Sequence, residues 1–299
     1  MEPIKKIDMH AHAVAFPQWV PKLKITGYRF INAPELISFY DRLNIEKGVL
    51  LPIVSMEGNW HIMTNENCKL LADTYPDRFL WFCNVDPRAA EHSPDADLLW
   101  IMEHYKALGA KGVGELTSNL YADDPMVDNL FAQAAQIDFP VTIHISPRPN
   151  YNYGIVDDIG LPRLEKMLKK HPDVKILGHS QPFWAEMSAD LTEDMRNDYP
   201  KGKVTEGRLP KLMREYGNLF CDLSAGSGAN ALMRDPEYAA RFMEEFADRI
   251  LYACDFCTIT NAHQFAFNDF LDQMVTDGML SEENYRKIVR GNAERLLKL

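Results

Sequence analysis

The sequence predicts an α/β fold, and within that class a (β/α)8 TIM barrel. Short apolar and β-branched runs alternate with segments that carry apolar residues at helical spacing, and eight strand-like runs follow one another. Strands that alternate with helices indicate a parallel sheet, because a parallel return requires a crossover. Eight such units favour closure into a barrel, and an open sheet with one or two misassigned strands is the alternative.

The expected strands are short apolar runs rich in β-branched residues. They cover residues 4–12, 47–55, 79–87, 110–116, 140–146, 174–180, 218–224 and 250–256. Turn-forming residues introduce several of them, such as Gly109 and Asp173. No glycine-rich phosphate-binding turn follows the first run, which argues against a dinucleotide-binding sheet.

The expected helices lie between these strands. They cover residues 34–43, 65–75, 96–108, 125–137, 161–170, 235–247 and 263–276. Two stretches exceed what a minimal barrel needs, residues 13–33 after the first strand and 181–210 after the sixth. Both follow the carboxyl ends of strands, where barrel enzymes build their sites. We therefore expect loop insertions in a single domain that spans residues 1–299.

The composition argues against several kinds of partner. The 299 residues include 32 Lys and Arg against 43 Asp and Glu, a formal net charge of −11, and no basic cluster stands out. Neither nucleic acid nor an anionic membrane surface is therefore an expected partner. No apolar run approaches the roughly 18 residues of a membrane span. The expected partner is a small-molecule substrate.

Two features set the expected location of the protein. The first six residues carry charges where a signal peptide needs an apolar stretch. Five cysteines are an odd number, which argues against a disulfide framework and for a reducing compartment. We expect a cytoplasmic protein.

The first expected strand ends in a pair of histidines. Side chains alternate along a strand, so His10 and His12 point to the same face, and Asp8 is expected on that face one step deeper. Two neutral imidazoles at this spacing can chelate one divalent ion, with Zn–N distances of about 2.0–2.1 Å. The pair alone is weak evidence, because histidines with purely structural roles are common.

Other expected strands also end in an ionisable side chain. These side chains are Glu115, His144, His179 and Asp255, at the ends of the fourth, fifth, sixth and eighth runs. Each one alone is better explained as a hydrogen-bonded residue at the barrel rim, but the whole set is hard to explain by chance. A barrel that buries so many polar groups must satisfy them, and a metal ion does so.

This ordered set of residues resembles the amidohydrolase superfamily. More narrowly, it is similar to the amidohydrolase-2 group of metal-dependent TIM-barrel enzymes, the aminocarboxymuconate-semialdehyde decarboxylase-like proteins, over nearly the whole chain. The resemblance implies that His10 and His12 are the metal ligands of strand one and that His144 is the ligand of strand five. It also implies that His179 is the strand-six histidine and that Asp255 is the carboxylate of strand eight.

Strand four departs from the pattern of many binuclear relatives. They carry a carboxylated lysine where this sequence has Glu115, although some relatives bridge two metals with a glutamate there. We favour one tightly held ion, with Glu115 as a ligand or a hydrogen-bonding neighbour of the ligands, and two ions remain open. Zinc is the favoured divalent ion for a site of nitrogen and oxygen ligands, with manganese and iron as alternatives.

These residues predict a hydrolase that activates water to cleave a C–O or C–N bond next to a carbonyl. The expected substrate is a small organic molecule that bears a carboxylate. A bound divalent ion lowers the pKa of its water from about 15.7 towards about 7. Asp255 is expected to accept and return a proton, and His179 to orient the water or polarise the carbonyl.

Two loop residues are candidate substrate contacts. Arg148, just past the fifth strand, could hold a substrate carboxylate in a bidentate ion pair. Trp60, after the second strand, could line an apolar pocket. A solvated arginine and a packing tryptophan explain the two positions equally well.

Two alternative functions use the same site. One is a metal-dependent, non-oxidative decarboxylase that acts on an aromatic or unsaturated carboxylic acid. The other is a metal-binding barrel that serves as a scaffold without catalysis, and the presence of both Asp255 and His179 argues against it. A homodimer is expected from the habit of the resembled group.

Overall fold

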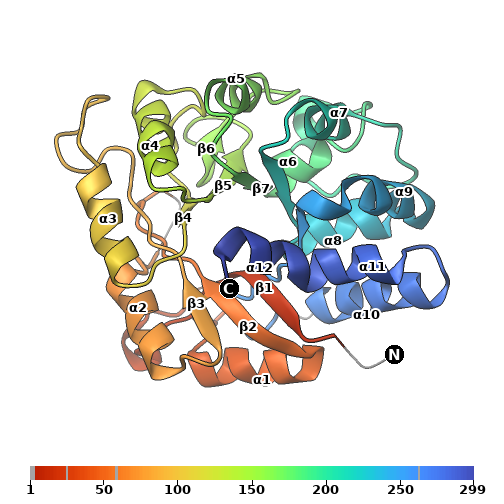
Figure 1. Cartoon of the computed structure of the whole chain (residues 1–299), viewed down its shortest axis with the longest axis horizontal. Coiled ribbons are helices and arrows are strands. Elements are labelled where there is room, and N and C mark those ends of the chain that lie inside the picture. The colour runs from red at the N-terminus through yellow and green to blue at the C-terminus, as the bar shows by residue number, and fades with distance from the viewer. Residues whose placement is uncertain (1–3, 25, 58–59, 262) are drawn as a thin grey trace.

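The computed structural model describes residues 4–24, 26–57, 60–261 and 263–299. The start of the N-terminal stretch and one residue of the expected loop 13–33 lie outside the described residues. Strands surround the centre of the molecule and most helices lie outside them (Figure 1). This arrangement agrees with the (β/α)8 barrel that the sequence predicts.

A strand overlaps each of the eight expected runs. These strands are β1 (Lys6–Ala11), β2 (Ile45–Leu50), β3 (Phe79–Trp81), β4 (Val113–Leu116), β5 (Val141–Ser146), β7 (Ile176–His179), β8 (Leu219–Asp222) and β9 (Ile250–Leu251). Each pairs in parallel with its neighbours, in the orders β1-β2-β3 and β4-β5-β7-β8-β9. The sequence did not predict β6 (Ile155–Val156), which pairs with β5 outside this path.

Backbone hydrogen bonds join the two groups of strands at both edges. On one side, the amide of Cys83 donates to the carbonyl of Gly112 at 3.0 Å. On the other, the amide of Met9 donates to Tyr252 at 3.0 Å, and the amide of Asp255 donates to the carbonyl of His10 at 2.7 Å. The eight strands therefore form a closed parallel barrel, and the open-sheet alternative is wrong.

The seven expected helices are present within a few residues of their expected ends. They are α1 (Ala33–Leu43), α2 (Asn65–Thr74), α3 (Leu99–Ala107), α4 (Pro125–Gln136), α5 (Pro162–Lys170), α9 (Pro236–Phe246) and α10 (His263–Thr276). Further helices are α6 (Gln181–Ala185), α7 (Arg208–Glu215), α8 (Ala225–Met233), α11 (Glu282–Arg286) and α12 (Asn292–Leu297). Four short helical turns are η1 (Pro17–Trp19), η2 (Glu193–Met195), η3 (Ala247–Arg249) and the π-turn η4 (Lys287–Gly291).

Side-chain caps determine where several helices begin. The side chain of Asn32 accepts a hydrogen bond from the amide of Glu35 at 3.0 Å, and the Glu35 carboxylate accepts from the amide of Asn32 at 2.9 Å. This capping box satisfies two amides that the first turn of α1 leaves without helical partners. Asp124 and Asp235 cap α4 and α9, each with a proline at the next position.

Apolar side chains fill the barrel interior and the layer between strands and helices. One cluster contains strand residues and two residues of α12, namely Ile7, Met9, Val49, Leu51, Phe82, Leu177, Phe220, Leu251, Ala253, Ala293 and Leu297. In Figure 1, α12 lies over the centre of the ring of strands. The last helix therefore covers one end of the barrel and leaves the other for polar side chains.

The two long stretches after strands have different structures. The described residues between 13 and the start of α1 contain η1 and one isolated bridge, between Val14 and Asn32. Residues 181–210 instead contain α6 and η2 and lead into α7. The buried Trp184 of α6 donates from its indole to the carbonyl of Asp222 at 3.0 Å. This stretch is therefore packed onto β8 rather than looping freely.

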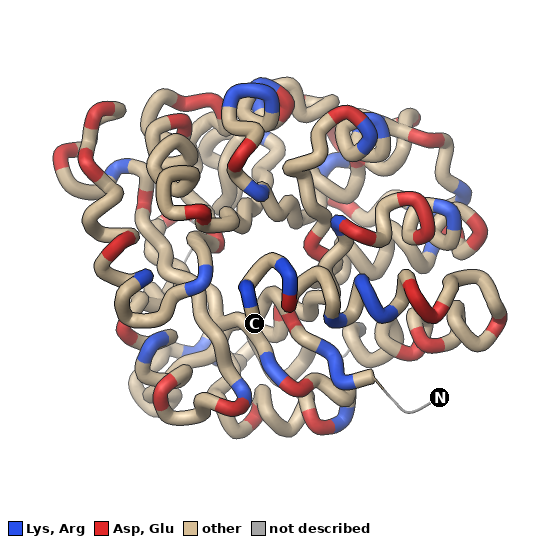
Figure 2. The backbone as a smooth tube through the Cα atoms, in the orientation of Figure 1, with Lys and Arg blue, Asp and Glu red and all other residues tan. Residues whose placement is uncertain are grey.

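The molecular surface mixes charges of both signs. Lys and Arg alternate with Asp and Glu over the outer helices (Figure 2). No helix in the described part of the chain has the length and apolar character needed to cross a membrane. The expectation that nucleic acid is not a partner stays a prediction.

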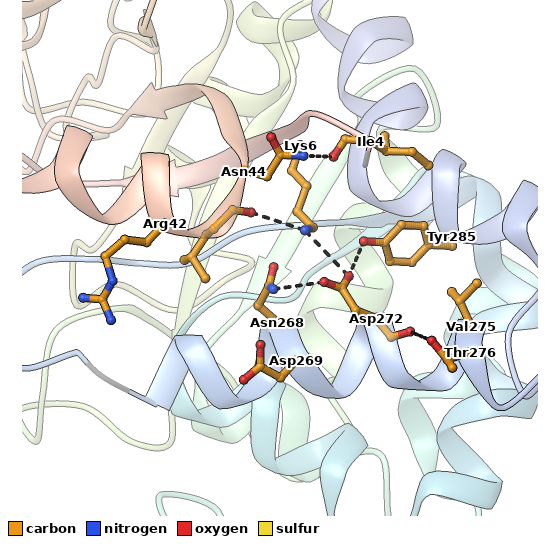
Figure 3. Close-up of a pocket in the computed structure, with 11 residues that line it drawn as sticks. Ile4, Lys6, Arg42, Asn44, Asn268, Asp269, Asp272, Val275, Thr276 and Tyr285 are labelled. Atoms are coloured by element: carbon orange, nitrogen blue, oxygen red, sulfur yellow. Dashed lines mark hydrogen bonds and ion pairs between the residues drawn. The ribbon is translucent and has the colours of Figure 1, made fainter. Parts of the chain in front are cut away.

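One pocket lies at the amino-terminal end of β1, away from the strand ends that carry the candidate ligands (Figure 3). It has a volume of about 420 Å³. The ammonium of Lys6 donates to the carbonyl of Leu43 at 3.3 Å and lies 3.7 Å from a carboxylate oxygen of Asp272. Tyr285 also donates to Asp272. These polar groups satisfy one another, so we assign this pocket a structural role.

Candidate metal centre

The end of β1 places its two histidines through an irregular stretch of backbone. The pairing with β2 shifts register between Asp8 and Ala11. The carboxylate of Asp8 accepts hydrogen bonds from the amides of His10 at 3.0 Å and Cys254 at 2.9 Å, and from the hydroxyl of Tyr40 at 2.7 Å. Asp8 therefore ties β1 to α1 and to the chain after β9, a detail that simple strand alternation did not predict.

The surroundings of His10 and His12 fix which ring nitrogen carries a proton. Nδ1 of His12 lies 2.9 Å from the carbonyl of Leu51, and Nδ1 of His10 lies 2.7 Å from Oδ2 of Asp222. Both oxygens only accept at neutral pH, so each Nδ1 is the donor, and each Nε2 of the neutral ring has a lone pair for a cation. The two Nε2 atoms nevertheless lie 3.2 Å apart. Two facing lone pairs at this distance call for a positive charge between them.

Two carboxylates face the same pair of nitrogens. Oδ1 of Asp255 lies 3.5 Å from Nε2 of His12 and 3.8 Å from Nε2 of His10. Oε2 of Glu115 lies 3.5 Å and 3.6 Å from the same two atoms. A group of acceptors without a donor is the arrangement that a divalent cation satisfies.

A second group of ligand atoms surrounds the other oxygen of Glu115. Its Oε1 lies 2.8 Å from Nδ1 of His144 and 3.3 Å from Nε2 of His179. These two nitrogens are 3.1 Å apart, and Nδ1 of His179 lies 2.8 Å from the hydroxyl oxygen of Ser224. Each oxygen of Glu115 therefore faces a different pair of imidazoles.

Three overlapping sets of side chains have ligand atoms within 4.8 Å of one another. The sets are His10, His12 and Glu115; His10, His179 and Asp255; and Glu115, His144 and His179. The six predicted side chains come from five strand ends on one side of the barrel. Five of the six are buried and Asp255 is partly buried, and their ligand types fit one or two divalent metal ions.

Burial and charge act in opposite directions on the ionisable groups. Burial lowers the pKa of His10, but the nearby carboxylates of Asp222 and Glu115 raise that pKa well above its usual value. Burial alone would raise the pKa of Glu115, and the charge and hydrogen bonds of the imidazoles hold it well below its usual value. Burial lowers the pKa of His144. The carboxylates therefore favour a positive charge at Nε2 of His10, which either a second proton or a metal ion would supply.

The two predicted substrate contacts do not join these sets. Arg148 is exposed, and its guanidinium lies 4.3 Å from the centre of the Tyr151 ring. Trp60 is 38% exposed and stacks on Phe30, with ring centres 4.8 Å apart. Neither residue has a contact with the six ligand-type side chains among the interactions of the described residues.

The sequence-based prediction missed Asp222, Ser224 and Tyr153. Asp222 is the last residue of β8 and the only charged residue of Leu219–Asp222. An ionisable residue at the end of an apolar strand is the feature that identified the other candidates. Applying that rule to the seventh run would have found it. Tyr153 lies in an irregular segment before β6, and nothing in its sequence marked it as close to His144.

A closed parallel barrel with imidazoles and carboxylates at one end defines the class of metal-binding TIM-barrel enzymes. The family model described as Amidohydrolase matches residues 7–299. The chain therefore belongs to the amidohydrolase family and is an enzyme, so the scaffold alternative is set aside. The comparison with curated protein sequences gives no significant match.

Solved structures of low sequence identity share the fold. A 5-carboxyvanillate decarboxylase from Novosphingobium aromaticivorans, in complex with manganese and a nitrobenzoic acid, has 19% identity and a TM-score of 0.65 over 98% of this chain and 96% of that chain. A 2,6-dihydroxybenzoate decarboxylase from Rhizobium has 18% identity and a TM-score of 0.60, with 99% of each chain covered. A probable 2-pyrone-4,6-dicarboxylic acid hydrolase from Acinetobacter baumannii has 14% identity and a TM-score of 0.60 over 99% of this chain and 100% of that chain.

Proposed function

We propose that the chain is a metal-dependent hydrolase that cleaves a C–O or C–N bond next to a carbonyl in a small organic substrate. One observation carries the proposal: the Nε2 atoms of His10 and His12 face each other at 3.2 Å, and Asp255 and Glu115 add oxygens at 3.5 to 3.8 Å. These atoms are acceptors, so a divalent cation is the group they suit.

The six side chains have separate roles in this proposal. His10, His12, His144, Glu115 and Asp255 hold the metal, which when bound lowers the pKa of a water molecule so that hydroxide is available at neutral pH. Asp255 accepts a proton from the attacking water and returns it to the leaving group. His179 orients the water or the carbonyl, or joins the ligands of a second ion.

The geometry supports two ions better than one. Each oxygen of Glu115 faces its own pair of nitrogens, His10 and His12 on one side, and His144 and His179 on the other. A carboxylate shared in this way suits two cations with a bridging ligand. Zinc fits the nitrogen and oxygen ligands, and manganese fits them too, as in the similar decarboxylase structure.

Elemental analysis of purified protein tests the metal site. Wild type produced with excess zinc and manganese is expected to carry two equivalents, and His10→Ala far less. His104→Ala, which changes an exposed histidine on α3, is the matched control and should carry as much as wild type. A wild type with no more metal than His10→Ala would refute the site.

A substrate panel separates hydrolysis from decarboxylation. The panel contains dihydrocoumarin, 4-nitrophenyl acetate, 4-nitroacetanilide, 2,6-dihydroxybenzoate and 5-carboxyvanillate, with acid release and CO2 measured in parallel. Acid release without CO2 is the expected result. CO2 from an aromatic acid without hydrolysis would favour the alternative, a non-oxidative decarboxylase, which the similarity in fold to two decarboxylases supports.

Other parts of the proposal concern the surroundings of the enzyme. We retain a small-molecule substrate, a cytoplasmic location and a homodimer as proposals that rest on the sequence. Light scattering of the purified protein measures the last of these, and a monomer at micromolar concentration would remove it.

A further inference from the structure

An extra strand holds the chain close to the metal-ligand group after β5. β6 pairs with β5 through Ile155 and Val156, just after the segment that contains Tyr153. The amide of Gly154 donates to the carbonyl of Thr117 at 2.8 Å. The side chain of Asn119 donates to the carbonyl of Asn152 at 2.8 Å, so contacts from beyond β4 fix this segment on both sides of Tyr153.

The segment lies so close to His144 that a glycine is required. Gly154 has φ of +113°, and a Cβ atom there would lie 2.8 Å from both Cδ2 and the carbonyl oxygen of His144. Any side chain would therefore collide with a candidate metal ligand. The backbone geometry, rather than a flexible loop, sets the position of the preceding residue.

Tyr153 is packed directly on this ligand. The ring centres of Tyr153 and His144 are 4.5 Å apart, with their planes tilted by 50°. The phenol hydroxyl of Tyr153 is a hydrogen-bond donor at neutral pH. Within the described ranges, no side chain or backbone group forms a hydrogen bond with that hydroxyl. It is a free donor beside the ligand group.

The carboxylates of the ligand group come from two strand ends. Glu115 lies in β4, with Oε1 2.8 Å from Nδ1 of His144, the ring on which Tyr153 packs, and Asp255 follows β9. Within the described ranges, neither Lys nor Arg forms an ion pair with Glu115 or Asp255.

We propose that the Tyr153 hydroxyl donates a hydrogen bond to the substrate oxygen on the reacting carbon and so selects acyl compounds such as esters, lactones and amides. The inference rests on the proposed function and names its substrate-facing donor. The hydrogen bond from a donor that is already in place becomes stronger as negative charge develops on the substrate oxygen. The guanidinium of Arg148, the contact that the sequence predicted, lies 4.3 Å from the centre of the Tyr151 ring instead.

Two matched variants test the proposal on metal-loaded full-length protein. Tyr153→Phe keeps the ring on His144 and removes the hydroxyl, whereas Tyr151→Phe removes an exposed hydroxyl from the same loop. Steady-state rates are measured on the ester, lactone and amide of the panel. For Tyr153→Phe we expect kcat to fall about 10- to 100-fold, KM to change less than threefold, and metal content to stay at the wild-type value. Tyr151→Phe should match wild type.

Each other outcome contradicts the proposal. A kcat for Tyr153→Phe within twofold of wild type would remove Tyr153 from a substrate-facing role. Loss of metal or a lower Tm in Tyr153→Phe would show that the hydroxyl supports the fold instead. If metal-loaded wild type turns over none of the three acyl probes, the substrate class is wrong. Metal content in the same samples separates this failure from failure of the metal site.

Discussion

The residues behind His10 and His12 decide which ring nitrogen faces the site. Leu51 and Asp222 each present an oxygen to the Nδ1 atom of a strand-one histidine, and this directs both Nε2 atoms to the centre of the site. The hydroxyl oxygen of Ser224 lies 2.8 Å from Nδ1 of His179, so Nε2 of that ring faces Glu115. The sequence pattern finds the candidate ligands, and these neighbours orient them.

Asp222 is the strongest case for a positioning residue. Its Oδ2 faces Nδ1 of His10 at 2.7 Å, and its Oδ1 accepts from the amide of Ser224 at 2.8 Å. Asp222→Asn leaves only one acceptor for these two donors. We expect metal affinity to fall about 10- to 100-fold, measured by competition with a chromophoric chelator. An affinity within twofold of wild type would show that His10 needs no carboxylate behind it.

At the scale of elements, short connections rather than long helices surround the end of the barrel that carries the candidate ligands. β6 contains only Ile155–Val156, yet it holds the chain against His144. The stretch after β7 forms α6 and η2, and Trp184 of α6 packs onto β8. Such elements are too short for hydrophobic periodicity to reveal them.

Gly154→Ala tests how tightly the β6 connection is built. The new methyl group would lie 2.8 Å from His144, and the alanine would have to keep the positive φ of Gly154. We expect the free energy of unfolding to fall by about 1–3 kcal/mol, with loss of bound metal. Gly160→Ala is the matched control, because Gly160 has φ of +86° but nothing within 4 Å of its Cβ position. Equal losses in the two variants would mean that the contact with His144 is unimportant. Chemical denaturation of both variants measures the difference.

A buried carboxyl at the start of α5 predicts a pH dependence of stability. Asp157 accepts hydrogen bonds from the amides of Asp158, Arg163 and Leu164, and burial raises its pKa from 3.8 to about 6. The folded state therefore keeps a proton that the unfolded chain has lost between about pH 4 and pH 6. Since the folded state binds more protons in this window, the free energy of unfolding falls as pH rises through it.

Asp157→Asn removes this titration. The amide also loses one acceptor, a cost that does not depend on pH. We expect the Tm of the variant, relative to wild type, to rise as pH increases from 4 to 7, measured by circular dichroism on metal-free protein. Asp158→Asn changes an exposed neighbour and should show the wild-type profile. Parallel profiles for Asp157→Asn and wild type would contradict the raised pKa.

At the scale of the whole molecule, the sequence predicted the barrel because eight buried strands repeat one local pattern. The same repetition placed Glu115, His144, His179 and Asp255 at one end, since parallel strands finish at the same edge. The sequence could not predict β6 or the position of Arg148, because both depend on contacts between loops. The register shift next to Asp8 is equally nonlocal, since its partners lie in α1 and after β9.

The barrel closes where its first and last strands meet, and the candidate ligands lie across this junction. The amide of Asp255 donates to the carbonyl of His10 at 2.7 Å, and both residues belong to one set of possible ligands. A metal held by His10 and Asp255 would link β1 to the chain that follows β9. Glu115 and His144 would extend that link to β4 and β5. Metal binding is therefore expected to stabilise the whole fold and not only the mouth.

The free energy of this link can be measured. A ligand at 100 times its Kd adds about 2.7 kcal/mol to the free energy of unfolding. Exhaustive chelation should therefore lower the Tm of wild type by several degrees, and added zinc or manganese should restore it. His10→Ala should show little response to either treatment, whereas His104→Ala should respond like wild type. If chelation leaves the wild-type Tm unchanged while removing the metal, the ion binds without joining the strands, and the closure of the barrel depends on backbone hydrogen bonds alone.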